Sequence, residues 1–178
     1  MRIAKEDSLV LVVDVQEKLV PHMHDKEAAV SKMVTLVRGA KVLDVPIIAA
    51  RQYPQGLGDI VMPLRLQLTE SHDKMTFSCC GDPLFMEAIR NKGKKNAIVI
   101  GVETHVCVLQ TAIDLKAAGF AVIVAVDAVA SRFQRDYEIA LKRMEQEGIL
   151  LTTTESVLFE LCRQAGGETF KTISNLVK

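Results

Sequence analysis

The sequence predicts a single α/β domain of three layers, α/β/α, around a mostly parallel central sheet. Two patterns lead to this prediction. Short apolar segments rich in β-branched residues recur along the chain without polar alternation, and longer amphipathic segments lie between them. Strands of this composition are typical of a parallel sheet that helices cover on both faces. Their alternation with helices implies right-handed crossovers between strands.

Five segments are predicted as buried strands of a Rossmann-like sheet. They span residues 8–14, 45–50, 97–100, 121–126 and 149–152. Each is dominated by aliphatic residues, so each is expected to be buried on both faces.

Helical patterns fill most of the intervals between these strands. One helix is expected to start with Asp82 as its N-cap and Pro83 at its first position. The others are expected over about residues 26–43, 104–118, 135–146, 155–164 and 170–177. Residues 52–73 form the one long irregular section, which suggests a functional lid or an interface segment. A short helix within 61–68 is an alternative there.

The composition limits the partners of the protein. A length of 178 residues suits one domain, residues 1–178. Basic and acidic residues number 22 each, for a formal net charge of +0, so neither nucleic acid nor an anionic membrane is a favoured partner. The charged N-terminus lacks the apolar core of a signal peptide, and the apolar run 9–13 is too short to cross a bilayer. A cytoplasmic location is therefore expected.

The four cysteines are read first as small buried apolar residues, because none falls in a Cys-x-x-Cys pair. They are Cys79, Cys80, Cys107 and Cys162. Cys107 differs, since it lies in the first turn of the helix predicted over 104–118, directly after a strand. Free backbone N–H groups and the helix dipole favour a thiolate with a depressed pKa at such a place, and they can stabilise an oxyanion.

Aspartates at strand ends are the other candidates, because ligands of parallel sheets bind at the carboxyl ends of the strands, near the point where strand order reverses. Asp14 ends the first strand, and partial burial there would raise its pKa into the range of a general base. It can equally be a helix cap or a salt-bridge partner. Asp127 is interpreted as a cap or structural acid, and Lys74 taken alone as a surface lysine.

Three motifs taken together change this interpretation. They are Val12-Val13-Asp14-Val15-Gln16, Lys74-Met75-Thr76-Phe77-Ser78 and Gly101-Val102-Glu103-Thr104-His105-Val106-Cys107-Val108. Their order and spacing, along essentially the whole chain, resemble the isochorismatase-like cysteine hydrolases, which include nicotinamidases and N-carbamoylsarcosine amidase. Together with the segment 52–58, the third motif is most similar to the isochorismatase-domain-containing subgroup.

This resemblance implies an Asp-Lys-Cys triad, carried here by Asp14, Lys74 and Cys107. It also implies a non-proline cis peptide between Val102 and Glu103, and an oxyanion hole from the backbone N–H groups of Glu103 and Cys107. The implied reaction is cofactor-free hydrolysis of a C–N bond in a small amide or ureide, through a thioester on Cys107. Homo-oligomers are implied as well.

The chain departs from the family where nicotinamidases hold a metal through an aspartate and histidines beside the second strand. It has Ala50-Arg51-Gln52-Tyr53-Pro54 at that place. No metal site is therefore predicted, and the pair His22 and His24 lacks a third ligand. The substrate pocket is predicted to be lined by Gln16, Gln52, Tyr53, Phe77 and Thr104.

Two other functions stay open. The fold can serve as a non-catalytic scaffold or partner-binding protein that has lost turnover, although the intact triad argues against this. A nucleotide-binding module is weakened by the absence of a glycine-rich loop, since Gly56-Leu57-Gly58 lacks the third glycine. His105 is two residues from Cys107, and such positions on a helix do not face each other, so a cap, pocket or interface role is expected.

Overall fold

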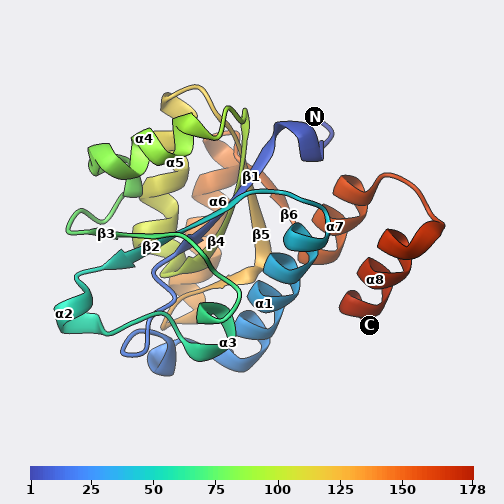
Figure 1. Ribbon diagram of the computed structural model, residues 1–178. Coiled ribbons are helices and arrows are strands. Elements are labelled where there is room, and N and C mark those ends of the chain that lie inside the picture. The colour runs from blue at the N-terminus through green and yellow to red at the C-terminus, as the bar shows by residue number, and fades with distance from the viewer.

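The computed structural model describes all residues, 1–178, and is built on a six-stranded sheet in which every strand pair is parallel (Figure 1). The strands are β1 (Ser8–Val13), β2 (Ile47–Gln52), β3 (Ser71–Lys74), β4 (Asn96–Val102), β5 (Ala121–Ala130) and β6 (Leu150–Thr152). Their spatial order is β3-β2-β1-β4-β5-β6. The predicted α/β/α class with a parallel sheet is confirmed, and strand order reverses between β1 and β4.

Helices cover both faces of this sheet. They are α1 (Lys26–Val42), α2 (Pro54–Leu57), α3 (Met62–Arg65), α4 (Pro83–Asn91), α5 (Leu109–Ala117), α6 (Gln134–Gln146), α7 (Thr154–Cys162) and α8 (Gly167–Val177). Single turns are η1 (Lys5–Asp7), η2 (Val20–His22), η3 (Cys79–Gly81) and η4 (Thr104–Val108). One core cluster joins the sheet to α1, α7 and α8, and a second joins it to α4, α5 and α6, as Figure 1 illustrates.

The central strand β1 shows why its sequence lacks polar alternation. All six of its residues are buried. Val10 and Val12 belong to the core cluster on the α1 face, whereas Leu9, Leu11 and Val13 belong to the cluster on the opposite face. Because successive side chains of a strand point to opposite faces, a strand between two helical layers must be apolar throughout.

The expectation of one irregular section over 52–73 was wrong in part. This section contains the one-turn helices α2 and α3, the second of which falls within the alternative helix at 61–68, and it ends in strand β3. β3 is an edge strand paired with β2, and its sequence Ser-His-Asp-Lys is polar. An edge strand is buried on fewer sides, so backbone pairing rather than apolar composition defines it. Its register places Lys74 beside Gln52.

Most helix boundaries follow the local signals, but α8 begins at Gly167 instead of residue 170, and the helix after β4 differs as well. The Asp82 side chain accepts a hydrogen bond from the backbone N–H of Phe85, so α4 begins as predicted. The helix expected over 104–118 instead starts as a π-helical turn, η4, and becomes α-helical only at Leu109. No helix in the chain has both the length and the apolar composition needed to cross a membrane.

Gly101 brings β1 and β4 unusually close at the reversal of strand order. Its φ is +129°, a conformation that glycine adopts without steric cost, and a Cβ there would overlap the backbone of Val13. Val13 pairs with Gly101 in the sheet register. The residues that follow these two strands, Asp14 and the segment leading into η4, therefore start from adjacent points.

Candidate active site

The structure brings together three side chains that lie far apart in the sequence. Asp14 follows β1, Lys74 ends β3, and Cys107 lies in η4. The Lys74 ammonium donates a hydrogen bond to Asp14 Oδ2 at 2.7 Å, and neither side chain is accessible to solvent. Cys107 is 6% exposed, and its thiol is close enough to Asp14 for each group to shift the pKa of the other. The three groups meet at the carboxyl edge of the sheet, where the order of strands reverses.

Lys74 is saturated by oxygen acceptors. Besides Asp14, its Nζ contacts Gln52 Oε1 at 2.7 Å and the backbone carbonyls of Thr76 at 3.1 Å and Phe77 at 3.0 Å. An ammonium has three protons to donate, so none remains for a ligand. Lys74 therefore holds the Asp14 carboxylate and the turn after β3 in place. It is not the surface lysine that its sequence context alone suggests.

Asp14 has one oxygen without a well-formed hydrogen bond, and the Cys107 thiol and the Gln52 backbone are the groups near the carboxyl that could supply one. Two buried side-chain oxygens of the protein lack a hydrogen-bond partner, Asp14 Oδ1 and Thr104 Oγ1. Thr104 begins the same turn that carries Cys107. Leaving a buried polar atom unpaired costs about 1–3 kcal/mol, so such atoms are rare and call for an explanation such as an ordered water, local strain or a catalytic role. Asp14 also has φ 53°, in the left-handed region.

The acid–base properties of the pair differ from the sequence prediction. Burial raises the pKa of the Asp14 carboxyl, while the charge and hydrogen bond of Lys74 oppose this rise. Burial also raises the pKa of the Cys107 thiol, and the nearby Asp14 carboxylate raises it further. The predicted depressed thiol pKa was therefore wrong. Loss of water and the facing Asp14 carboxylate outweigh the charge of Lys74, so the pKa of the Cys107 thiol lies above its ordinary value.

The backbone around Cys107 is irregular. The peptide bond between Val102 and Glu103 is cis. The Glu103 carbonyl accepts hydrogen bonds from the backbone N–H groups of Val106 at 3.1 Å and Val108 at 3.2 Å, which closes the turn containing Cys107. A π-helical turn of this kind is rare and is found frequently at functional sites.

Two other cysteines lie in the helical layer next to Cys107. Cys79 belongs to the same core cluster, and its backbone N–H donates to Thr111 Oγ1 at 3.0 Å. Burial raises the pKa of Cys79 to about 12 and that of Cys80 to about 11. Asp14 is not among the hydrogen-bond partners of either thiol. Cys79 fits the interpretation as a buried structural residue, whereas Cys80 is only partly buried.

Two of the predicted pocket residues are committed to internal hydrogen bonds. The Gln16 side chain accepts from the backbone N–H of Gln52 at 2.7 Å and donates to the carbonyls of Gln52 and Gly58 at 3.0 and 2.8 Å. The Gln52 side chain bridges Lys74 and the Met75 carbonyl. Both glutamines therefore position Lys74 and the loop after β2.

The other predicted pocket residues have free groups. Tyr53 and Phe77 expose 46% and 56% of their surface at the ends of β2 and β3. Thr104 is fully buried, and its hydroxyl is the unpaired atom described above. Tyr53 and Phe77 are thus accessible to solvent, Thr104 is enclosed, and the two glutamines are held by internal hydrogen bonds.

The sequence analysis missed the residues contributed by the segment after β5. Arg132 Nε donates to Glu103 Oε2 at 2.9 Å, next to the cis peptide. A cavity of about 350 Å3 is lined by Leu19, His22, Met23, Glu103 and Arg132. His105 Nδ1 lies 3.0 Å from Ser131 Oγ, which anchors η4 to the same segment. The sequence did contain one signal for these residues: the segment after β5 follows a parallel strand, and ligands of parallel sheets bind at such places.

Comparison with protein-family models shows the family to which the chain belongs. The Isochorismatase domain model matches residues 8–156. The chain belongs to the isochorismatase family. It is 37% identical over 178 residues to isochorismatase domain-containing protein 2A of Mus musculus, with 99% of this chain and 85% of the mouse protein covered. The family resemblance inferred from the three motifs is thereby confirmed.

Solved structures of the isochorismatase family superimpose closely on the chain. The MAR1 ribonuclease of Caenorhabditis elegans has a TM-score of 0.93 at 37% identity, covering 99% of this chain and 92% of its own. The YcaC gene product of Escherichia coli, described as an octameric hydrolase of unknown specificity, has a TM-score of 0.93 at 27% identity and coverages of 99% and 90%. YcaC of Pseudomonas aeruginosa, solved with hexane-2,5-diol and covalent acrylamide, has 0.90 at 26% identity and coverages of 99% and 95%.

Ion pairs join the residues at the end of β2 to the segments around Asp59 and Asp73. Arg51 Nε contacts Asp73 at 2.7 Å and Arg51 Nη1 contacts Asp59 at 3.0 Å. Asp59 is shared with Arg65 at 3.3 Å. The chain contains no cluster of three or more histidine, cysteine, aspartate or glutamate side chains arranged as metal ligands.

Proposed function

We propose that this isochorismatase-family protein is a cysteine hydrolase that cleaves the C–N bond of a small amide or ureide through a thioester on Cys107. The observation that carries the proposal is the unpaired Oδ1 of Asp14, a buried carboxylate held by Lys74 beside a buried thiol. General-base catalysis requires a basic group with a free acceptor atom next to the protonated nucleophile. The Asp14 carboxyl, with its raised pKa and free Oδ1, and the Cys107 thiol fit this arrangement.

The first half-reaction forms the acyl-enzyme. Asp14 takes the thiol proton of Cys107 while the sulfur attacks the carbonyl carbon of the substrate. The resulting oxyanion is stabilised by backbone N–H groups, for which Glu103 and Cys107 are the candidates. The C–N bond then breaks, and the leaving nitrogen takes the proton from Asp14. Ammonia or an amine departs, and the acyl group stays on the sulfur.

The second half-reaction releases the acid. Asp14, ionised again, accepts a proton from a water molecule that attacks the thioester carbon. The C–S bond breaks, and the sulfur regains its proton from Asp14. Lys74 keeps its partners throughout, and its charge compensates the buried negative charge of Asp14. The proton passes between Asp14 and Cys107, which are both buried, so the charge in each step stays away from solvent.

Two comparisons bear on the choice of substrate. The Pseudomonas aeruginosa relative carries covalent acrylamide, which is both a small amide and a reagent for nucleophiles. The Caenorhabditis elegans relative is named a ribonuclease, which makes RNA cleavage the second candidate. The net charge of +0 offers no general attraction for a polyanion, so the amide reaction is preferred.

The same proposal covers the setting of the protein. We expect a small-molecule substrate, no metal or cofactor in the reaction, and a cytoplasmic location. We also expect a homo-oligomer, because the Escherichia coli relative is described as octameric.

The test is a screen of small primary amides and ureides for ammonia release, with Cys107→Ala as the blank and Cys80→Ala as a matched control. We expect release by the wild type and Cys80→Ala, and none by Cys107→Ala. Mass spectrometry of the acid-quenched reaction should find the acyl group on Cys107. Equal rates from Cys107→Ala, or RNA cleavage that depends on Cys107 without any amide turnover, would contradict the proposal. Binding without any turnover would favour the scaffold.

A further inference from the structure

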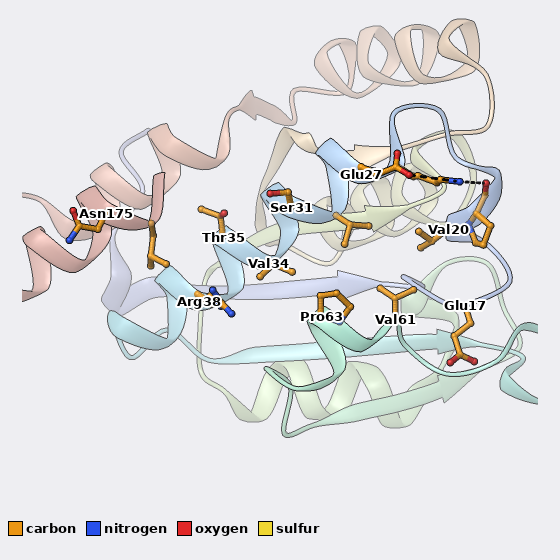
Figure 2. Close-up of a pocket in the computed structure, with 14 residues that line it drawn as sticks. Glu17, Val20, Glu27, Ser31, Val34, Thr35, Arg38, Val61, Pro63 and Asn175 are labelled. Atoms are coloured by element: carbon orange, nitrogen blue, oxygen red, sulfur yellow. Dashed lines mark hydrogen bonds and ion pairs between the residues drawn. The ribbon is translucent and has the colours of Figure 1, made fainter. Parts of the chain in front are cut away.

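A groove of about 760 Å3 runs beside α1, and none of the three active-site residues lines it (Figure 2). Its floor carries Val30 and Val34 of α1. Its walls come from three other segments, with Val20 of η2, Val61 and Pro63 at the start of α3, and Leu176 of α8.

The groove exists because one crossover lacks a full helix. The crossover from β1 to β2 supplies α1, a helix of 17 residues. The crossover from β2 to β3 packs on the same face, where Ile60, Leu64 and Leu68 join the core cluster of α1. It contributes only α2 and α3, of four residues each. The flank of α1 that a second crossover helix would cover in a doubly wound fold is therefore bare.

The groove-facing residues of α1 are Lys26, Glu27, Val30, Ser31, Val34, Thr35 and Arg38. From Glu27 to Arg38 their positions are symmetric about the midpoint between residues 32 and 33, and Lys26 lies one position outside this set. A two-fold axis through that midpoint would place Val30 opposite Thr35, and Ser31 opposite Val34, of a second antiparallel helix. The spacing of residues 27, 31, 34 and 38 is also that of a helix–helix seam.

The two ends of this set carry opposite charges that lack strong partners. Arg38 is exposed and pairs with no carboxylate of its own chain. Glu27 has an exposed fraction of 82%, and its one ion pair, with Lys26, is 4.0 Å long. Eleven residues of α-helix separate Glu27 from Arg38 by about 16 Å, so they cannot pair within one chain. Figure 2 shows them at opposite ends of the groove.

We infer that this groove is a two-fold interface in which α1 packs antiparallel against α1 of a second copy of the chain. Arg38 then faces Glu27 of the second copy at one end, and the reciprocal pair forms at the other end. Isologous interfaces are self-complementary in this way. The inference rests on the self-association proposed above and is independent of the cysteine chemistry.

The test measures the mass of the assembly by sedimentation velocity across a concentration series. Arg38→Glu and Glu27→Arg should each weaken association at least about tenfold, because each places like charges opposite one another twice. An equimolar mixture of the two variants should restore association as a heterodimeric contact, since both pairs are then of opposite charge. Lys32→Glu is the matched control, because Lys32 lies on α1 but lines a different cavity, with Tyr137.

The possible outcomes test self-association, the α1 interface and the antiparallel pairing separately. A monomeric wild type at about 100 µM would overturn both the self-association and the interface. An associated wild type whose charge variants behave like Lys32→Glu would overturn the interface alone. Variants that dissociate but are not restored by mixing would overturn the antiparallel pairing. Restoration in the mixture supports the interface and shows that both variants are folded. Amide hydrolysis is not the readout, so a failed substrate screen leaves the result unaffected.

Discussion

Two aspartates lie toward the carboxyl ends of parallel strands, and their carboxylates have different surroundings. Asp127, in β5, accepts hydrogen bonds on Oδ1 from the Thr154 backbone N–H at 2.8 Å and from the Thr154 hydroxyl at 2.9 Å. It ties the start of α7 to the sheet. Asp14 has one oxygen on a buried ammonium and the other free beside a thiol.

This difference teaches what separates a structural acid from a reactive one. Two neutral donors of Thr154, at the first position of α7, occupy Oδ1 of Asp127, whereas Thr153 is the N-cap of this helix. Asp14 lies where strand order reverses and the following loops diverge, so neighbouring backbone does not saturate it. The charge of Lys74 allows the Asp14 carboxylate to stay buried, and its hydrogen bond occupies only one of the two carboxylate oxygens. Asp14 follows β1 directly and Asp127 lies within β5, three residues before its end, and the two carboxylates have different partners.

The largest expected effect is on turnover when Asp14 loses its basicity. Asp14→Asn should lower kcat/KM for the amide substrate by about 10³-fold or more, because a general base contributes about 10²–10⁴-fold. The measurement is ammonia release under steady-state conditions. Alkylation of Cys107 by iodoacetamide should slow in parallel, followed by peptide mass spectrometry in a Cys162→Ser background. Unchanged alkylation would indicate that Asp14 does not activate the thiol.

Removal of the Lys74 ammonium should produce the largest loss of stability. Lys74→Met leaves the Asp14 carboxylate buried without its counter-ion, and breaking a buried ion pair from one side costs about 3–5 kcal/mol. Urea unfolding measures the loss. Lys171→Met removes an exposed ion pair with Glu168 and should change the free energy of unfolding by less than about 0.5 kcal/mol. Similar values for both variants would mean that the buried pair contributes no more than a surface pair.

Asp127 should have the reverse profile, a loss of stability without a loss of activity. Asp127→Ala removes the acceptor of both Thr154 groups and should lower the free energy of unfolding by about 1–2 kcal/mol. At a temperature where the variant is folded, kcat/KM should stay within about twofold of the wild type. A loss comparable to that of Asp14→Asn would show that the two aspartates act together.

The smallest effect is a displacement of the acidic limb of the pH–rate profile. The mechanism needs ionised Asp14, and burial raises the pKa of this carboxyl above its ordinary value of 3.8. Activity should therefore fall as the pH drops through that raised pKa, at higher pH than an ordinary carboxyl would give. Because the pKa of Cys107 is raised as well, kcat/KM should not increase across pH 8–9, near the ordinary thiol pKa of about 8.5. A rise there would indicate a free thiolate mechanism.

The class of the fold and the three residues that converge, Asp14, Lys74 and Cys107, could be predicted from the sequence. Apolar β-branched runs such as 8–13 are typical of strands in a sheet covered on both faces, and the motifs around Asp14, Lys74 and Cys107 lie within the range that the family model matches. Strand β3 escaped prediction because its pattern is polar. The π-helical start of the helix after β4 escaped because hydrogen-bond registers in a turn do not show in periodicity.

What the amino-acid sequence determined by itself is local and periodic: which segments are strands, where α4 is capped, and which residue types could do chemistry. The tertiary structure alone decided the sign of the thiol pKa, the free oxygen of Asp14 and the saturation of Lys74. These depend on burial and on partners supplied by β2, β3 and the turn at 76–77, which are distant in sequence. Electrostatic energies depend on the groups that surround a charge in space, so they cannot be predicted from the order of residues along the chain.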